Sequence, residues 1–551
     1  MEAKEDSSLE SVLQGYSLAG KKYAFIFSLG KSIVNEAYRF SKDNYLHYDD
    51  PNQDDVDIVA KFLEDLGFDF DEELYGVSPT VSSDDESSDS MVENQPTAKK
   101  PTFHALRNFP ARKYHQLTVL LKTKMQDASC ILMYFIKRKS GPSMINFDDK
   151  YIPISMIRRQ LMGIPCPKIF IVQSNITKNE FVPSILLNAE QLQSSETTLP
   201  ESANILICYL PNNEDAEKSV PEILREELFK PDDINVILTK VMNRLNLKES
   251  KTNPKVSSTL LKHLYLNKRP TDPSESEVDQ PFYQISEGKK CLAYAFLFEH
   301  FDLRSSLTDL VKIDFEQLTS TFKFLGFDYK FCVKDGRMTV QEFIAEFNGI
   351  LADKKKMMEC ECIILFLSSH GDMNGMVHAS DGLIPRDVIV SLLSDCEELE
   401  GKPKLIFIDA CRGSSCDRAV KDEMNRPNAS SSPEEKRKDS VIVCSRESYD
   451  SVNENNMWAI CCCKCPRMSD VMVVSSSTEG NVSFYRKDTG SQFIRKLCDN
   501  LKRYGEDYNL ISILNIVMSQ VADLNFPCFG TQLKQQVTFT STLRKLLRFP
   551  K

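Results

Sequence analysis

The sequence lacks an apolar run that approaches the roughly 18 residues needed to span a bilayer, so we expect no membrane-spanning helix. It also lacks an excess of positive charge, because the formal net charge is −11. This balance excludes a general electrostatic affinity for nucleic acid. The first ten residues, MEAKEDSSLE, are acidic and polar, which is unlike a secretory signal. These absences favour a cytoplasmic protein, and 551 residues are enough for two or three domains.

The cysteines do not suggest a disulfide framework. There are 17 of them, an odd number. Several, such as Cys208 and Cys362, lie inside apolar runs that are typical of buried strands. We therefore expect free thiols in a reducing compartment.

Six short strings occur twice in the same order, which indicates two similar copies of one unit. The clearest are CILMYF at 130–135 with CIILFL at 362–367, and Leu-Gly-Phe-Asp at 66–69 and again at 325–328. Both copies alternate short apolar runs, such as KLIFI and VMVVS, with helical patterns, such as DFEQLTSTFKFLGF. This alternation predicts an α/β fold of two three-layer α/β/α domains in tandem.

Loop composition sets the predicted boundaries. The stretch RPTDPSESEVDQP at 269–281 is polar and rich in proline, as linkers are. We expect a tail over 1–20, a first domain over 21–268, a linker over 269–284 and a second domain over 285–551. In the second domain, a loop over 416–468 separates a larger part, 285–415, from a smaller part, 469–551.

The second copy carries a pattern suited to nucleophilic catalysis. His370 and Gly371 follow one apolar strand, and Cys411 follows the next, in SSHG and ACRG. The carboxyl ends of strands are where open α/β sheets place their sites. A cysteine nucleophile needs a nearby base, and a glycine lets backbone N–H groups approach a developing oxyanion.

These motifs, 41 residues apart, resemble those of the caspase family. FEHFDLRSSLTD, FYRKDTGSQFIRKLC and FTSTLRKLLRFP also resemble family segments, so the resemblance covers about 285–551. It implies that Cys411 attacks the scissile carbonyl of a protein substrate and that His370 serves as its base and acid. It also implies that the amides of Gly371 and Cys411 hold the oxyanion. No cofactor and no metal site are expected.

Caspases cut after aspartate, and Arg304 and Arg486 match the basic residues of their primary pocket. Two departures affect this specificity. The family has glutamine where this chain has Asp409, and related metacaspases and paracaspases with aspartate there cut after basic residues. The arginine loop also has one residue more than the family spacing before Thr308. A carboxylate at 409 should repel a substrate aspartate unless an arginine neutralises it.

The loop over 416–468 falls where caspases are cut into two subunits. Within it, Asp422, Asp439 and Asp450 are candidate processing sites, and a merely solvated loop is the alternative. Cysteines 461–463 and 465 match no standard zinc spacing, and lipidation or no function are the other interpretations.

The first copy lacks the chemistry. Alignment of the repeated strings places Arg138 at the histidine position and Asn175 at the cysteine position, with Gln173 opposite Asp409. The side chains of Arg138 and Asn175 can supply neither the base nor the thiolate that this chemistry needs. Residues 21–268 therefore resemble a pseudoprotease.

Two functions remain open. The first is an endopeptidase of apoptotic or immune signalling; the second is a catalytically weak decoy that regulates other caspases by pairing with them. Caspases dimerise through their last strand, and both copies keep that segment, as KVSSTLLKHLYL and QVTFTSTLRKLLRF. We expect the copies to pair, within one chain or between chains.

Overall fold

The structure is a computed structural model, and the site residues predicted above do not all fall within the part that it describes. Arg138, Asn175 and the three candidate processing aspartates lie outside that part, as do cysteines 461–463 and 465. The described residues are 10–28, 53–69, 106–107, 127–137, 144–147, 150–153, 157–158, 160–161, 164–174, 198–211, 217–245, 254–267, 281–285, 291–413, 417–421, 441–443, 469–528 and 531–549.

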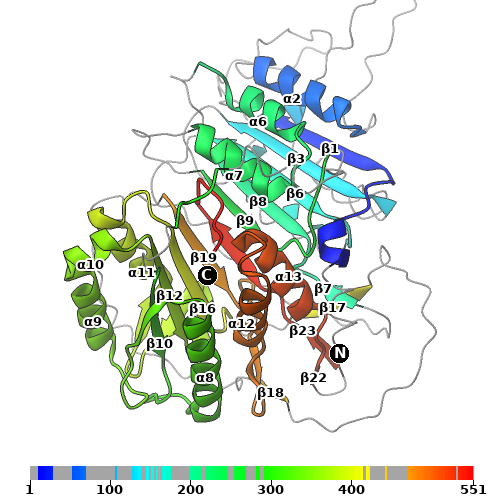
Figure 1. Ribbon diagram of the computed structural model, residues 1–551. Helices are drawn as coiled ribbons and strands as arrows, with labels where there is room; N and C mark the ends of the chain where they lie inside the picture. Colours follow the sequence, from blue (N-terminus) through cyan, green and yellow to red (C-terminus); the bar gives the residue numbers. More distant parts are fainter. Residues whose placement is uncertain are drawn as a thin grey trace, which may run out of the picture.

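One sheet of 12 strands runs through the whole molecule (Figure 1). Its spatial order is β2-β1-β3-β6-β8-β9 and then β24-β19-β16-β12-β10-β11. The strands of the first half are β1 (Lys22–Ser28), β2 (Leu106–Arg107), β3 (Cys130–Lys137), β6 (Lys168–Ser174), β8 (Ile205–Leu210) and β9 (Lys255–Ser258). Those of the second half are β10 (Cys291–Leu297), β11 (Asp328–Phe331), β12 (Cys362–Ser368), β16 (Lys404–Asp409), β19 (Val471–Ser475) and β24 (Thr538–Ser541).

The two halves of the sheet have the same arrangement. In each, five strands pair in parallel and the last one, β9 or β24, pairs antiparallel. The repeated strings CILMYF and CIILFL lie in β3 and β12, which occupy equivalent places. This arrangement agrees with the predicted α/β class.

The halves meet where β9 pairs antiparallel with β24. Ser257 lies opposite Thr540, and the Thr540 hydroxyl lies 3.3 Å from the Ser257 hydroxyl. Ala203, Val236 and Leu261 of the first half belong to the same buried cluster as residues of the second half, including Leu514 and Val517. The closing segments predicted to pair therefore do so within this one chain, over a continuous apolar core.

Helices cover both faces of the second half of the sheet, as predicted. One face carries α8 (Thr308–Phe324), α12 (Gln492–Tyr504) and α13 (Leu510–Ala522), and the other carries α9 (Val340–Ala352) and α11 (Arg386–Ser394). A short helix, α10 (Lys354–Glu359), joins α9 to β12. Strand β10 shows why both faces are buried: Ala293, Ala295 and Leu297 enter one cluster, and Leu292, Tyr294 and Phe296 enter the other.

In the first half, α2 (Gln53–Asp65), α6 (Val220–Leu228) and α7 (Ile234–Leu245) pack on one face of the sheet (Figure 1). Smaller sheets surround the large one. The first pairs β4 (Met144–Phe147) with β5 (Lys150–Pro153), and the second consists of β13 (Gly371–Asp372), β14 (Met376–His378) and β15 (Leu383–Pro385). The third consists of β18 (Val441–Val443), β20 (Phe484–Arg486) and β21 (Gly490–Ser491). The fourth joins β7 (Thr198–Pro200) of the first half to β17 (Asp417–Lys421), β22 (Phe526–Cys528) and β23 (Thr531–Lys534) of the second. The described residues also include two 3-10 helices, η3 (Met373–Gly375) and η4 (Glu397–Leu399).

The repeated Leu-Gly-Phe-Asp string has the same structural task in both halves. Gly67 follows α2 with a φ of 76°, and Gly326 follows α8 with a φ of 66°. Glycine adopts this left-handed conformation without steric cost, so it ends each helix. Asp69 then bridges to Tyr23 of β1, and Asp328 begins β11 beside β10. The string therefore returns the chain from helix to sheet.

Two boundaries differ from the sequence-based expectation. Residues 1–20 were expected to form a tail, yet Val12 is buried in the junction core and the Tyr16 hydroxyl bonds to Asn204. The helical pattern DFEQLTSTFKFLGF begins at Asp314, whereas α8 begins at Thr308. Asp314 is instead a buried residue in the middle of the helix.

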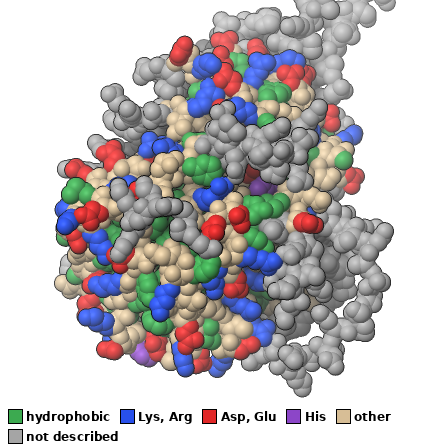
Figure 2. Space-filling view, in the orientation of Figure 1, with side chains coloured by type: hydrophobic (Ala, Val, Ile, Leu, Met, Phe, Trp, Pro, Cys, Tyr) green, Lys and Arg blue, Asp and Glu red, His purple; other side chains and the backbone are tan. Residues whose placement is uncertain are grey.

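Within the described residues, no helix has the length and apolar composition required to cross a membrane. Figure 2 shows acidic and basic side chains interspersed over both halves on the face it presents. The ten cysteines whose side chains are described as free thiols are all buried: Cys130, Cys166, Cys208, Cys291, Cys332, Cys360, Cys362, Cys396, Cys411 and Cys498.

Candidate active site

Two neighbouring parallel strands place the predicted dyad at one edge of the sheet. Strand β12 ends at Ser368, which lies opposite Asp409, the last residue of β16. The Ser369 amide donates to the Asp409 carbonyl at 3.1 Å, so the pairing continues beyond the strands. Because adjacent strands lie about 4.8 Å apart, His370 and Cys411 emerge side by side.

The backbones of Gly371 and Cys411 are in direct contact. A Cβ atom built on Gly371 would lie 1.9 Å from the Cys411 carbonyl oxygen and 2.9 Å from the Ala410 Cβ. No side chain fits at 371, since the obstacle is backbone. The glycine of the SSHG motif is therefore required by packing. It keeps the two residues proposed to hold an oxyanion next to each other.

The imidazole of His370 is buried and held in one orientation. Its Nε2 lies 2.9 Å from the Ser305 carbonyl oxygen, and its ring packs edge-on against Phe301 at 4.8 Å between centroids. A carbonyl only accepts hydrogen bonds, so Nε2 carries a proton. In the neutral ring, Nδ1 then holds the basic lone pair, as a general base requires.

The thiol of Cys411 is almost enclosed. The residue is 7% exposed and clusters with Val482, Phe484, Phe526 and Leu533. The Ser483 amide donates toward its Sγ at 3.4 Å. An N–H donor favours a thiolate, whereas the apolar cover restricts access to it.

The two arginines predicted for the primary pocket are held by neighbouring acids. Arg486 forms a two-pronged ion pair with Asp488, at 3.1 and 3.2 Å. Arg304 lies 3.7 Å from Asp372. The partners of both guanidiniums named here are therefore carboxylates other than Asp409.

Asp409 lies in a shell of serine hydroxyls. Ser483 Oγ donates to Asp409 Oδ1 at 3.0 Å. Burial raises the pKa of Asp409, and hydrogen bonds from Ser491, Ser476 and Ser483 act against this rise. The sequence posed the question of which arginine neutralises this carboxylate. The structure surrounds it with hydroxyls, and burial shifts it toward the neutral acid.

Sequence reasoning missed a second carboxyl beside Asp409. Asp314 of α8 is buried, and its Oδ1 accepts a hydrogen bond from the Ser491 amide at 3.0 Å. Burial first, and then the charge of Asp409, raises the pKa of Asp314 well above its usual value. Its only signal in the sequence was a carboxylate at the first residue of the helical pattern DFEQLTSTFKFLGF.

In the first half, Gln173 occupies the place that the alignment matches to Asp409. It is buried, its Oε1 accepts from the Tyr134 hydroxyl at 2.9 Å, and its Nε2 donates to Asp55 at 3.0 Å. These bonds satisfy a polar group inside the core. They give Gln173 a structural task that does not involve a substrate.

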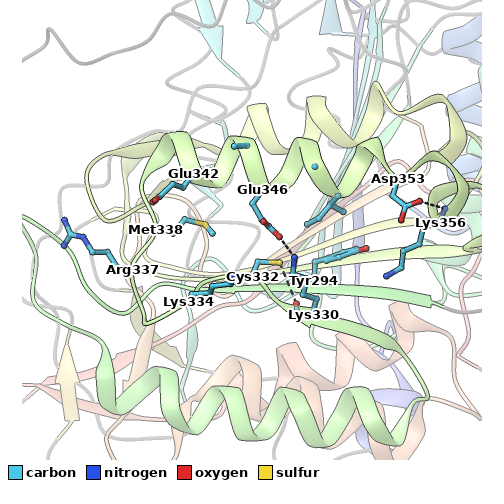
Figure 3. Close-up of a pocket in the computed structure, with 13 residues that line it drawn as sticks. Tyr294, Lys330, Cys332, Lys334, Arg337, Met338, Glu342, Glu346, Asp353 and Lys356 are labelled. Atoms are coloured by element: carbon cyan, nitrogen blue, oxygen red, sulfur yellow. Dashed lines mark hydrogen bonds and ion pairs between the residues drawn. The ribbon is translucent and has the colours of Figure 1, made fainter.

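A separate groove of about 640 Å³ lies between α9 and the end of β11 (Figure 3). It is lined by basic and acidic side chains, and Lys330 bonds to Glu346 across it. Neither His370 nor Cys411 is among its lining residues. Among the described residues, no group of three or more His, Cys, Asp or Glu side chains is arranged to hold a metal ion.

A second histidine, His378, lies beside the first. Its ring centroid is 6.4 Å from that of His370, and its amide donates to the His370 carbonyl at 2.9 Å. Burial, and then the charge of Arg304, lowers the pKa of His378 from 6.5 to about 4, while Asp372 acts in the opposite direction. His378 is therefore neutral near pH 7, in contact with the base of the candidate dyad.

This shift predicts an acid-sensitive element in the second half. His378 binds a proton less readily in the folded protein, so its stabilising contribution is complete above pH 6.5 and is lost as the pH falls toward 4. The loss should reach up to about 3 kcal/mol. In chemical denaturation, His378→Asn should flatten the pH dependence of the unfolding free energy in this window. His300→Asn, at a side chain 48% exposed, is the control. Parallel curves for wild type and His378→Asn would contradict the assignment.

Comparison with known proteins places these observations in a family. The family model for the caspase domain matches residues 292–548. Caspase-1 of Spodoptera frugiperda is 26% identical over 283 residues, which are 49% of this chain and 82% of that protein. Caspase drICE of Drosophila melanogaster is 26% identical over 278 residues, 48% of this chain and 72% of that protein. The crystal structure of Caspase-1 from Spodoptera frugiperda has 24% sequence identity and a TM-score of 0.38, over 50% of this chain and 95% of that chain. Residues 292–548 thus match the caspase domain, and the relatives named above are caspases.

Proposed function

We propose that the second half is a caspase-like cysteine endopeptidase with Cys411 as nucleophile and His370 as base. The observation that carries this proposal is the contact of Gly371 with the Cys411 backbone, beside an imidazole whose Nε2 is fixed by a carbonyl. This arrangement supports thiolate formation and leaves a basic Nδ1 for proton transfer. The amides of Gly371 and Cys411 would stabilise the oxyanion of the tetrahedral intermediate.

The uncut chain is proposed to be a zymogen. Cys411 is covered by four buried apolar side chains, Val482, Phe484, Phe526 and Leu533, which all come from the part after the long loop. Cleavage within 416–468 would free those neighbours to rearrange and open the thiol to substrate. Asp422, Asp439 and Asp450 are the candidate cleavage sites for this step.

Cleavage after aspartate is the specificity that we propose. Arg486 lies next to Tyr485 on β20, close in sequence to Ser483, which bonds to Asp409. Burial favours the neutral form of Asp409, which removes the repulsion expected between two carboxylates. A substrate aspartate would then exchange with Asp488 as the partner of Arg486. This competition predicts weaker aspartate recognition than a free arginine would give.

The first half is proposed to be a pseudoprotease that holds the second half in place. Besides the β9–β24 pairing, strand β7 of the first half pairs with β17, which begins six residues after Cys411. The backbone partners of β17 are thus β7 on one side and β23 on the other. Through this contact, the first half binds directly to the segment that follows Cys411 in the chain.

A decoy that pairs with other caspases is the alternative function. The occupied junction argues against it, because β24 already has β9 as its neighbour. Pairing with a second chain through this edge would require the displacement of β9 and exposure of the shared apolar core. A cytoplasmic peptidase of apoptotic or immune signalling fits the whole of the proposal better.

A thiol-reactive aspartyl peptide probe tests the proposed activity on the full chain, before and after cleavage at an engineered site within 422–440. The probe should label Cys411 after cleavage, and Cys411→Ala or His370→Ala should lower aspartyl peptide hydrolysis by about 10³-fold or more. Cys396→Ser is a matched control, since Cys396 is also 7% exposed and lies outside the site. Equal hydrolysis by wild type and Cys411→Ala, or no labelling of the cut wild type, would contradict the proposal.

Specificity can be tested separately at Asp409. Asp409→Gln removes a carboxyl that ionises more fully as the pH rises, so the ratio of aspartyl to arginyl cleavage should increase about tenfold at pH 8. Asp395→Asn, at an exposed acid away from the site, is the control. An unchanged cleavage ratio at pH 8 would show that Asp409 does not set the pocket.

A further inference from the structure

A cluster of cationic side chains gathers where the two halves meet. Its centre is Arg412, the residue after Cys411, which is 8% exposed. Its guanidinium lies 3.5 Å from Glu479 and donates to the Ser477 carbonyl at 3.4 Å. Its Nε is buried and has no hydrogen-bond partner among the described residues. A buried guanidinium N–H without an acceptor is costly, so this group has capacity for a further acceptor.

Two more arginines interact with the carboxylate of Glu479. Arg158 of the first half and Arg386 of the second each interact electrostatically with Glu479. Burial lowers the pKa of all three arginines, and for Arg412 the charges of Arg386 and Arg158 add to the lowering, to about 9. Glu479 therefore interacts electrostatically with all three guanidinium groups. Repulsion among them raises the free energy of the folded state.

The surroundings of this cluster are also polar and basic. Lys255 of β9 interacts electrostatically with Arg386 and with Asp387. Next to Glu479, the Thr478 hydroxyl lies 3.1 Å from the hydroxyl of Ser202 of the first half. Both halves thus contribute cations and hydroxyl groups to the surroundings of Glu479.

We propose that this junction binds a small multivalent anion of the phosphate class, held jointly by Arg158, Arg386 and Arg412. Guanidinium groups match phosphate oxygens in geometry, and one ligand can accept from several of them at once. Such an anion would supply the acceptor that Arg412 Nε lacks and would offset the repulsion among the arginines. Because the arginines come from both halves, the bound anion would also tie the halves together.

The test is thermal unfolding of the full chain with inorganic phosphate, compared with chloride at equal ionic strength. A saturating amount should raise the melting temperature by several degrees, with pyrophosphate and adenosine diphosphate separating free phosphate from a phosphate ester as the better ligand. Arg158→Gln should weaken phosphate binding about tenfold or more. Arg337→Gln, at an exposed arginine paired with Asp302, should leave the binding unchanged.

A second variant has the opposite expected sign. Glu479→Gln removes the carboxylate that competes for the three guanidiniums, so phosphate should bind about tenfold more tightly than to wild type. The variant should also be less stable than wild type when phosphate is absent. No phosphate effect beyond that of chloride would overturn the proposal, because the cluster would then be neutralised by the chain itself. An equal phosphate effect in wild type, Arg158→Gln and Glu479→Gln would overturn it as well, since the anion would bind elsewhere.

Discussion

The pairing of β9 with β24 is the interaction on which the rest of the structure depends. Each of these strands is the last of its half, and without the other it would present an open row of N–H and C=O groups. Their antiparallel pairing, with Ser257 opposite Thr540, joins two six-stranded arrays into one sheet. The apolar cluster beneath it contains Val236 of α7 and Val517 of α13. Separation of the halves would therefore cost both backbone hydrogen bonds and buried apolar area.

The candidate site is built outward from this junction. Strands β16 and β12 follow β24 and β19 in the sheet, and their carboxyl ends bring Cys411 and His370 together. The guanidinium of Arg412 forms an ion pair with Glu479, and the charge of Arg158 in the first half lowers the pKa of Arg412. Arg412, which follows the proposed nucleophile, therefore interacts with residues of both halves. The strands of the first half are consistent with this proposed supporting role.

Much of the fold could be predicted because it depends on local patterns. Apolar strings such as CIILFL fix strands buried on both faces, and the Leu-Gly-Phe-Asp string fixes where a helix ends and the chain returns to the sheet. The order of the motifs placed His370 and Cys411 at neighbouring strand ends. These features depend on residues close together in the chain, so a single sequence carries them.

The remaining features depend on contacts between distant residues. The cover over Cys411 comes from Phe484 and Phe526, more than 70 residues further along the chain. The burial of Asp314 near Asp409 is likewise set by tertiary packing. The spacing of apolar residues predicts helices and strands, but it does not predict which acidic and basic side chains come into contact. The environment of the pocket therefore required the structure.

The most direct test of the account is a cross-link across the junction. Ser257→Cys with Thr540→Cys should form a disulfide under mild oxidation, because the two hydroxyls that the sulfurs replace lie 3.3 Å apart. After cleavage at an engineered site in the linker, over 270–280, a non-reducing gel should show the two halves as one band. Ser257→Cys with Phe539→Cys, shifted by one residue, should remain largely uncross-linked. Separate bands for the first pair, or equal cross-linking of both pairs, would contradict the register that joins the two halves.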